Sequence, residues 1–243
     1  MPSPASASRP SVSPNSLGLV LAAGGSGTRF GADRPKTLLD CGGVPLWRRS
    51  LAVVAEAIPT GALSAIVVVA PAEHVDDFAS GPVGGIAVAT VAGGATRAQS
   101  VRNGLDRLAK SPQPPRWAVV HDAARPLVDS TETAATIAAA IKTGAALLTA
   151  PVVSTIKRVG EGRVLATVPR DDLRAAATPQ VARLDWLLAT DPDDGSTDES
   201  QALERAGRPV AVVEGSPTNI KVTTRGDLEM VEALLRLRAL DDD

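Results

Sequence analysis

The stretch LGLVLAAGGSGTRFG at residues 17–31 decides the fold. It begins with an apolar run from Leu17 to Ala23, which has the length of a buried strand. Four glycines follow within residues 24–31, and glycine lets backbone N–H groups approach and cradle phosphate oxygens. A strand that runs directly into such a loop predicts an α/β protein with a phosphate-binding turn after its first strand.

Two familiar versions of this loop are excluded. The sequence holds no G-x-x-x-x-G-K-[ST] motif, and Phe30 stands where the dinucleotide fingerprint has its third glycine. What remains is G-G-x-G-T-R, in which Arg29 is followed seven residues later by Lys36. A tight turn with two solvated cations would account for the glycines alone. The paired Arg and Lys favour phosphate binding over that interpretation.

Further apolar runs of strand length recur along the chain, with helical segments between them. This alternation predicts a Rossmann-like, doubly wound and mostly parallel sheet covered by helices. The runs are Leu17 to Ala23, Leu63 to Ala70, Ile86 to Val91, Trp117 to His121, Ala145 to Ala150 and Val210 to Glu214. Thr96 with Gln99, and Ser196 with Glu199, fit capping boxes that start helices.

Composition limits the class of protein. The chain has 243 residues, 44% hydrophobic, with 2% aromatic residues and no Tyr, so its core must consist of aliphatic side chains. A net charge of -2 argues against a general nucleic-acid binder, which needs a basic excess. A single cysteine, Cys41, excludes an intrachain disulfide framework and fits a reducing compartment, so we expect a cytoplasmic protein.

The two ends and one hairpin depart from the α/β pattern. Residues 1–16 hold four Pro and six Ser, and we expect them to form a disordered tail. No apolar run is long enough for a membrane helix. Two strands, Val152 to Val159 and Arg163 to Val168, are predicted to form a hairpin arm over about residues 152–170. A lone hairpin is marginal in water, so we expect it to pack on a second copy of the chain.

Other polar motifs follow predicted strands, where ligands bind in such sheets. Asp122 and Arg125 lie in His-Asp-Ala-Ala-Arg, a set able to bind sugar hydroxyls and phosphate or to form a surface ion pair. His121 beside them is expected to be a hydrogen-bonded structural residue. Gly93 to Ser100 opens a helix whose N-terminus suits anions, and Lys221 is predicted to lie in a late strand.

Taken in order along the chain, these motifs resemble one family, the 2-C-methyl-D-erythritol 4-phosphate cytidylyltransferases of the non-mevalonate isoprenoid pathway. The resemblance runs from about residue 17 to 235, and residues 17–238 would form the nucleotidyltransferase domain. The most specific motifs are His121-Asp-Ala-Ala-Arg125 and Asn219-Ile-Lys-Val-Thr223. The resemblance implies transfer of CMP from CTP to 2-C-methyl-D-erythritol 4-phosphate, a small polyol phosphate, by in-line attack with release of pyrophosphate. It also implies Mg2+ as cofactor and a homodimer joined through the hairpin arm.

The resemblance also implies a role for each matching residue. The catalytic residues would be Arg29 and Lys36, which neutralise the triphosphate, and Arg170 and Lys221, which hold the acceptor phosphate. The nucleotide would be bound by Ala23, Gly24, Gly25, Gly27, Gly94, Ser100 and Asp122, and the acceptor by Asp122, Arg125, Thr155, Thr178 and Thr197. Mg2+ often keeps its waters and bridges phosphates, so no protein metal ligand is predicted.

The chain departs from the family pattern at a few positions. Ala23-Gly-Gly replaces the commoner Ala-Ala-Gly, Thr37 follows Lys36 where Gln is frequent, and Ser154 stands where an Asp often precedes the arm threonine. Three alternatives remain open: a ribitol 5-phosphate cytidylyltransferase on the same scaffold, a non-catalytic nucleotide-binding domain, and a nicotinamide-dependent oxidoreductase. The failed fingerprint disfavours the last.

Overall fold

The computed structural model describes residues 12–24 and 34–241. Most of the tail predicted at residues 1–16, and the glycine loop from Gly25 onward, lie outside the described residues. Within the described part, no helix has the length and apolar character needed to cross a membrane.

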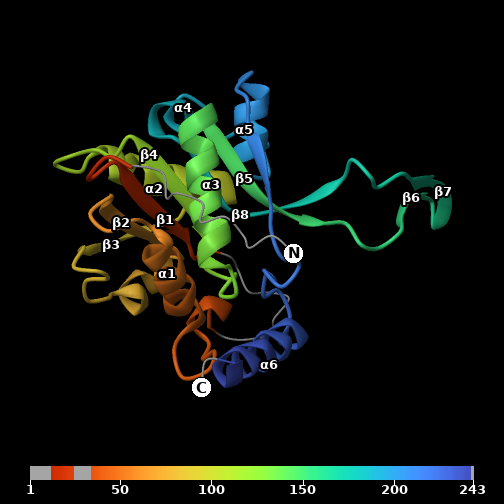
Figure 1. Ribbon diagram of the computed structural model, residues 1–243, viewed down its shortest axis with the longest axis horizontal. Helices are drawn as coiled ribbons and strands as arrows, with labels where there is room; N and C mark the ends of the chain where they lie inside the picture. The colour runs from red at the N-terminus through yellow and green to blue at the C-terminus, as the bar shows by residue number, and fades with distance from the viewer. Residues whose placement is uncertain (1–11, 25–33, 242–243) are drawn as a thin grey trace, which may run out of the picture.

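A seven-stranded sheet forms the centre of the protein, in the order β3-β2-β1-β4-β8-β5-β9 (Figure 1). All neighbouring strands pair in parallel except at β8, which is antiparallel to both β4 and β5. The strands are β1 Leu17–Ala22, β2 Leu63–Ala70, β3 Val88–Ala92, β4 Trp117–Asp122, β5 Ala145–Pro151, β8 Arg174–Arg183 and β9 Ala211–Glu214. The predicted mostly parallel α/β sheet is confirmed.

Helices cover both faces of the sheet because successive strand residues point to opposite sides. On β1, Leu19 and Leu21 pack toward α1 and α3, whereas Val20 packs toward α2. Gly104 of α2 lies so close to the sheet that a Cβ atom would come 2.6 Å from Val20, which explains the glycine there. The helices are α1 Leu46–Ala57, α2 Arg97–Ala109, α3 Ser130–Thr143, α4 Leu184–Leu188, α5 Glu199–Arg205 and α6 Arg225–Asp241, with short 3-10 helices η2 Lys36–Leu38 and η3 Ala72–Phe78.

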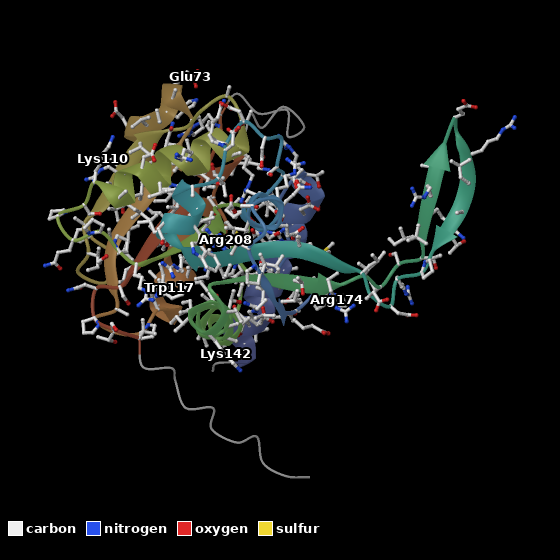
Figure 2. The ribbon with its side chains drawn as sticks, turned by 90° about the horizontal axis from the view of Figure 1, so that it is seen from above. Glu73, Lys110, Trp117, Lys142, Arg174 and Arg208 are labelled. Atoms are coloured by element: carbon white, nitrogen blue, oxygen red, sulfur yellow. The ribbon has the colours of Figure 1, made fainter. Side chains whose placement is uncertain are left out.

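A separate two-stranded hairpin, β6 Ile156–Gly160 and β7 Arg163–Val168, extends away from the body (Figures 1 and 2). Its two-residue turn consists of Glu161 and Gly162, both with positive φ, which suits the twist of a tight hairpin. The predicted hairpin is confirmed, although its first strand begins at Ile156 rather than Val152. In Figure 2, Arg174 lies where the arm meets the body.

Three local predictions were wrong, and one strand was missed. The run from Ile86 gives a strand only from Val88, because Ile86 pairs with Val83 in a tight turn. The helix at Glu199 is capped by Asp198, whose side chain accepts from the N–H of Gln201, rather than by Ser196. Residues 219–223 form no strand, and Lys221 lies in an extended segment that leads to α6. The long strand β8 was not predicted at all.

Candidate active site

The candidate site lies at the carboxyl ends of β1, β3 and β4, where ligands bind in open α/β sheets. The N–H of Ala23 donates to the carbonyl of Val69 (2.9 Å), and the N–H of Gly93 donates to that of Ala70 (2.8 Å). These bonds hold Ala23 and Gly93 on either side of the end of β2. A pocket of about 540 Å³ lies between them, and it is lined by Ala22, Gly24, Pro71, Ala72, Glu73, Gly93 to Arg97, and Ser100.

One wall of the pocket is the turn that begins α2. Ser100 Oγ accepts from the N–H of Gly94 (3.0 Å) and donates to the carbonyl of Thr96 (2.8 Å). A Cβ atom at Gly94 would come 2.6 Å from Cβ of Gln99, so the turn requires glycine. Thr96 caps α2 as predicted, accepting from the N–H of Gln99 (3.1 Å). The Gln99 carboxamide accepts from Ala95 rather than from Thr96 itself.

Asp122 is the centre of charge in the site. Its carboxylate accepts from Lys221 Nζ at 2.7 Å and from Arg97 Nη2 at 3.2 Å, and the Arg125 guanidinium lies 3.8 Å away. Burial alone would raise the pKa of Asp122, but Arg97 and Lys221 outweigh it and hold that pKa well below its ordinary value. The carboxylate is therefore ionised at every physiological pH.

Sequence reasoning missed two members of this cluster. Arg97 donates to Glu199 at 2.7 and 3.1 Å as well as to Asp122, so its guanidinium joins two carboxylates. Burial lowers the pKa of Arg97, but Glu199 and Asp122 together raise it by a larger amount, so the net shift is upward. Glu199 had been interpreted as a helix-capping residue. No local signal could have paired it with Arg97, because 102 positions separate them.

Hydrogen bonds to further residues around the cluster support it. Asp122 donates its backbone N–H to Thr178 Oγ1 (3.0 Å), and Asn219 donates its carboxamide N–H to the Thr178 carbonyl (3.0 Å). Arg125 in turn donates to the Asn219 carbonyl (2.7 Å). The structure therefore joins Asp122, Arg125, Thr178 and Lys221 of the predicted site. Thr178 is buried, and its hydroxyl faces the protein interior rather than the pocket.

The Lys36 turn is tied to the end of β1. Thr37 donates its hydroxyl to the carbonyl of Ala23 (3.2 Å), so the residue that departs from the family pattern anchors η2 beside the first glycine turn. Gly24 lines the pocket within the same region. Arg29, Gly25 and Gly27 lie outside the described residues.

Three predicted acceptor-binding residues are not brought to this cluster within one chain. Arg170 and Thr155 lie on the connections between the arm and the sheet, and Arg170 donates to the carbonyl of Val153. The arm leaves the body rather than folding over it (Figure 1). Thr197 is exposed, and its hydroxyl and N–H both donate to the Gln201 side chain, which steadies the start of α5.

Comparison with known proteins identifies this arrangement. A family model for 2-C-methyl-D-erythritol 4-phosphate cytidylyltransferase matches residues 17–237. The enzyme of that name from Chromobacterium violaceum is 41% identical over 90% of this chain and 97% of its own length. A bifunctional enzyme IspD/IspF from Gluconobacter oxydans is 46% identical over 60% of this chain, and that match spans only 38% of the longer protein. Other bifunctional relatives are likewise matched over little more than half their length.

The likeness extends to solved structures. The crystal structure of 2-C-methyl-D-erythritol 4-phosphate cytidylyltransferase from Thermus thermophilus superposes with a TM-score of 0.70 at 30% identity, covering 89% of this chain and 98% of that one. The match includes the body and the motifs that converge on Asp122. This chain belongs to the 2-C-methyl-D-erythritol 4-phosphate cytidylyltransferase family.

Proposed function

We propose that this protein transfers CMP from CTP to the phosphate of 2-C-methyl-D-erythritol 4-phosphate and releases pyrophosphate, a step of isoprenoid precursor synthesis. The observation that carries the proposal is the Asp122 cluster, in which Arg97, Arg125 and Lys221 converge beside the pocket between the glycine turns. Three cations against two carboxylates leave an excess of positive charge for anionic substrates. CTP and a small polyol phosphate are both anionic.

The chemistry is an in-line displacement. A phosphate oxygen of the acceptor forms a bond to the α-phosphorus of CTP, while the bond from that phosphorus to the bridging oxygen breaks and pyrophosphate leaves. No covalent enzyme intermediate is required, so catalysis consists of positioning and charge stabilisation. In this scheme Arg29 and Lys36 neutralise the triphosphate. Lys221 keeps Nζ hydrogens beyond its bond to Asp122 and holds the acceptor phosphate, with Arg125 nearby.

The nucleotide occupies the pocket beside Gly94 and Ser100. Ser100 commits its one hydroxyl hydrogen to Thr96 and accepts from Gly94, so only a lone pair remains for a ligand. Such an oxygen suits an amino group of cytosine. Ala23, Gly24 and the loop beyond them would approach the triphosphate through their backbone N–H groups.

Mg2+ belongs to the proposal as a partner of the triphosphate. The described residues contain no group of three or more His, Cys, Asp or Glu side chains placed to hold a metal. Both oxygens of Asp122 already accept bonds from cations. This donor set fits a metal held by phosphate oxygens and water, and the ion would neutralise phosphate charge there.

We also propose that the protein forms a homodimer through the hairpin arm. Val159, Val164 and Leu165 on the arm are 61–66% exposed, and the two arm strands pair only with each other among the described residues. A second chain would cover these apolar side chains and receive Arg170 and Thr155 at its acceptor site. We further propose a cytoplasmic location, where CTP is available and the lone Cys41 stays reduced.

The deciding experiment measures pyrophosphate release by the purified protein with Mg2+ and CTP, using methylerythritol phosphate or ribitol 5-phosphate as acceptor. Release with the first acceptor alone is expected. Release with the second alone would overturn the acceptor assignment and point to Ser154 on the arm. The absence of pyrophosphate release with both acceptors would favour a non-catalytic nucleotide-binding domain. Lys221→Met, assayed beside the wild type, shows how much release depends on the cluster.

A further inference from the structure

His121 is a buried titratable group to which the proposed mechanism gives no task. It lies in β4 next to Asp122, and none of its surface is exposed. Both ring nitrogens are engaged: Nε2 lies 3.1 Å from the carbonyl oxygen of Arg125, and Nδ1 lies 3.0 Å from Thr178 Oγ1. The predicted hydrogen bonding of His121 is confirmed, and the identity of its two partners suggests more than packing.

In a neutral ring, the two contacts fix the position of each proton in the series of hydrogen bonds that runs from Arg125 through His121 and Thr178 to Asp122. A carbonyl oxygen can only accept, so Nε2 must carry the hydrogen and Nδ1 must be the acceptor in a neutral ring. Thr178 must then donate its hydroxyl hydrogen to Nδ1. The hydroxyl oxygen consequently has its lone pairs available, and it accepts the backbone N–H of Asp122 at 3.0 Å. The reverse polarity would set two lone pairs against each other at the Arg125 carbonyl.

The imidazole therefore joins the two ends of the His-Asp-Ala-Ala-Arg turn. Through Thr178 it holds the amide of Asp122, and through Nε2 it holds the carbonyl of Arg125. The side chains of these two residues are two of the five members of the charged cluster. These contacts suit a neutral ring, because a second ring proton on Nδ1 would leave the Thr178 hydroxyl hydrogen without its acceptor.

The surroundings favour the neutral ring. Burial lowers the pKa of His121 to about 4. The bond to the Arg125 carbonyl and the charge of Asp122 act against that shift, while Arg125 and Lys221 act with it.

We propose that His121, as the neutral Nε2–H tautomer, is a positioning residue that orients Asp122 and Arg125 toward the substrates. The inference rests on the proposed function, because Asp122 is assigned to both substrates and Arg125 to the acceptor. It adds a separable claim, namely that each ring nitrogen serves a different substrate-binding residue.

Two substitutions separate the two nitrogens. The carboxamide of His121→Asn reaches about as far as Nδ1, so it keeps the bond from Thr178 and loses the one to Arg125. His121→Gln reaches about as far as Nε2 and keeps only the bond to the Arg125 carbonyl. We expect the KM for the acceptor alone to rise about tenfold in the Asn variant, the effect of one lost hydrogen bond, and both KM values to rise in the Gln variant.

Thr136→Val is the matched control. Thr136 is equally buried, and its hydroxyl donates to the Glu132 carbonyl on α3 (2.8 Å), away from the site. The Thr136→Val variant should be less stable than the wild type and should have unchanged KM values. If the two His121 variants behave like this control, changing stability but neither KM, the positioning role is wrong. If the wild type itself turns over no CTP, the proposed function fails instead.

A measurement on the wild-type protein tests the proposal even if the His121 variants do not fold. Long-range 1H–15N correlation spectra of the imidazole rings report the tautomer directly. The chain has only two histidines, and the partly exposed His74 supplies the reference signals. The spectrum of His121 should show a protonated Nε2 and a bare Nδ1 from about pH 5 to 8. A protonated Nδ1, or titration within that range, would overturn the proposal.

Discussion

The charged cluster around Asp122 and the hairpin arm differ in how their side chains are held. In the cluster, Arg97, Arg125 and Lys221 are held by buried carboxylates and by Asn219 within one chain. On the arm, apolar side chains such as Val159 and Leu165 are exposed. The cluster is thus preorganised by its own chain, whereas the described part of the chain leaves these apolar side chains of the arm exposed. Residues of the first region should act through charge and those of the second through assembly.

The largest expected effect tests the charge side of this comparison. Lys36→Ala should lower kcat at saturating substrates roughly a thousandfold, because a cation that acts on the transition state is removed while the fold is kept. Lys142→Ala, a change of the same type at an exposed position on α3, is the control and should leave kcat unchanged. Unchanged kcat in Lys36→Ala would remove this residue from the mechanism.

The next effect tests the assembly side. Arg170→Ala should reduce turnover about a hundredfold, since one charged contact to the acceptor phosphate is lost. Mixing it with Lys36→Ala under subunit exchange should restore about a quarter of the wild-type activity, because half the dimers are mixed and each has one intact site. Recovery in a titration of one variant against the other is the measurement. If no mixture recovers activity, the arm serves its own chain.

A pair of glutamates sharpens the comparison through stability. Glu199→Gln leaves Arg97 with Asp122 as its one remaining carboxylate, and we expect the free energy of unfolding to fall by about 2 kcal/mol, less than for a fully buried pair because Arg97 is 28% exposed. Glu214→Gln breaks a contact of 3.8 Å between exposed side chains beside the arm, worth less than about 0.5 kcal/mol. Urea unfolding of both variants decides the matter, and equal losses would contradict the contrast.

A smaller effect than that of Glu199→Gln is expected in the segment that follows Lys221. The Thr223 hydroxyl, with the N–H groups of Thr223 and Thr224, lowers the pKa of Asp227 to about 2, although burial opposes the shift. A carboxylate with a lowered pKa stabilises the fold above its ordinary value of 3.8, and that stability is lost as the pH falls toward 2. Asp227→Asn should cost about 1 kcal/mol near neutral pH.

Unfolding followed from neutral pH down to about pH 2 tests this linkage. The difference in stability between the wild type and Asp227→Asn should shrink as the pH drops from about 4 toward 2, because Asp227 of the unfolded wild-type chain takes up a proton there while the folded carboxylate is still largely ionised. A difference that stays constant through this range would show that Asp227 acts without its charge.

Local patterns in the sequence predicted the sheet and one half of the site. The run Leu63 to Ala70 is apolar except at Ser64 because β2 is buried in a parallel sheet, and the structure gives the same bounds. Asp122 and the Gly94 turn could be placed because parallel strands end at one edge. Glu199 could not, since its partner is distant in the sequence. Strand β8 was missed because four of its ten residues are Ala and it contains Pro179, both residue types that are depleted in strands, and its stability comes from strands paired on both sides.

The arm is attached to the body at both of its strands. Residues 152–155 and 169–173 are its only connections, and they leave the sheet where Pro151 of β5 pairs with Arg174 of β8. A segment held by two short tethers has fewer orientations open to it than a segment held at one end. Its docking therefore costs less conformational entropy than that of a peptide held at one end. Any partner surface meets an arm that is already close to its bound direction, and association can be tight with a small contact area.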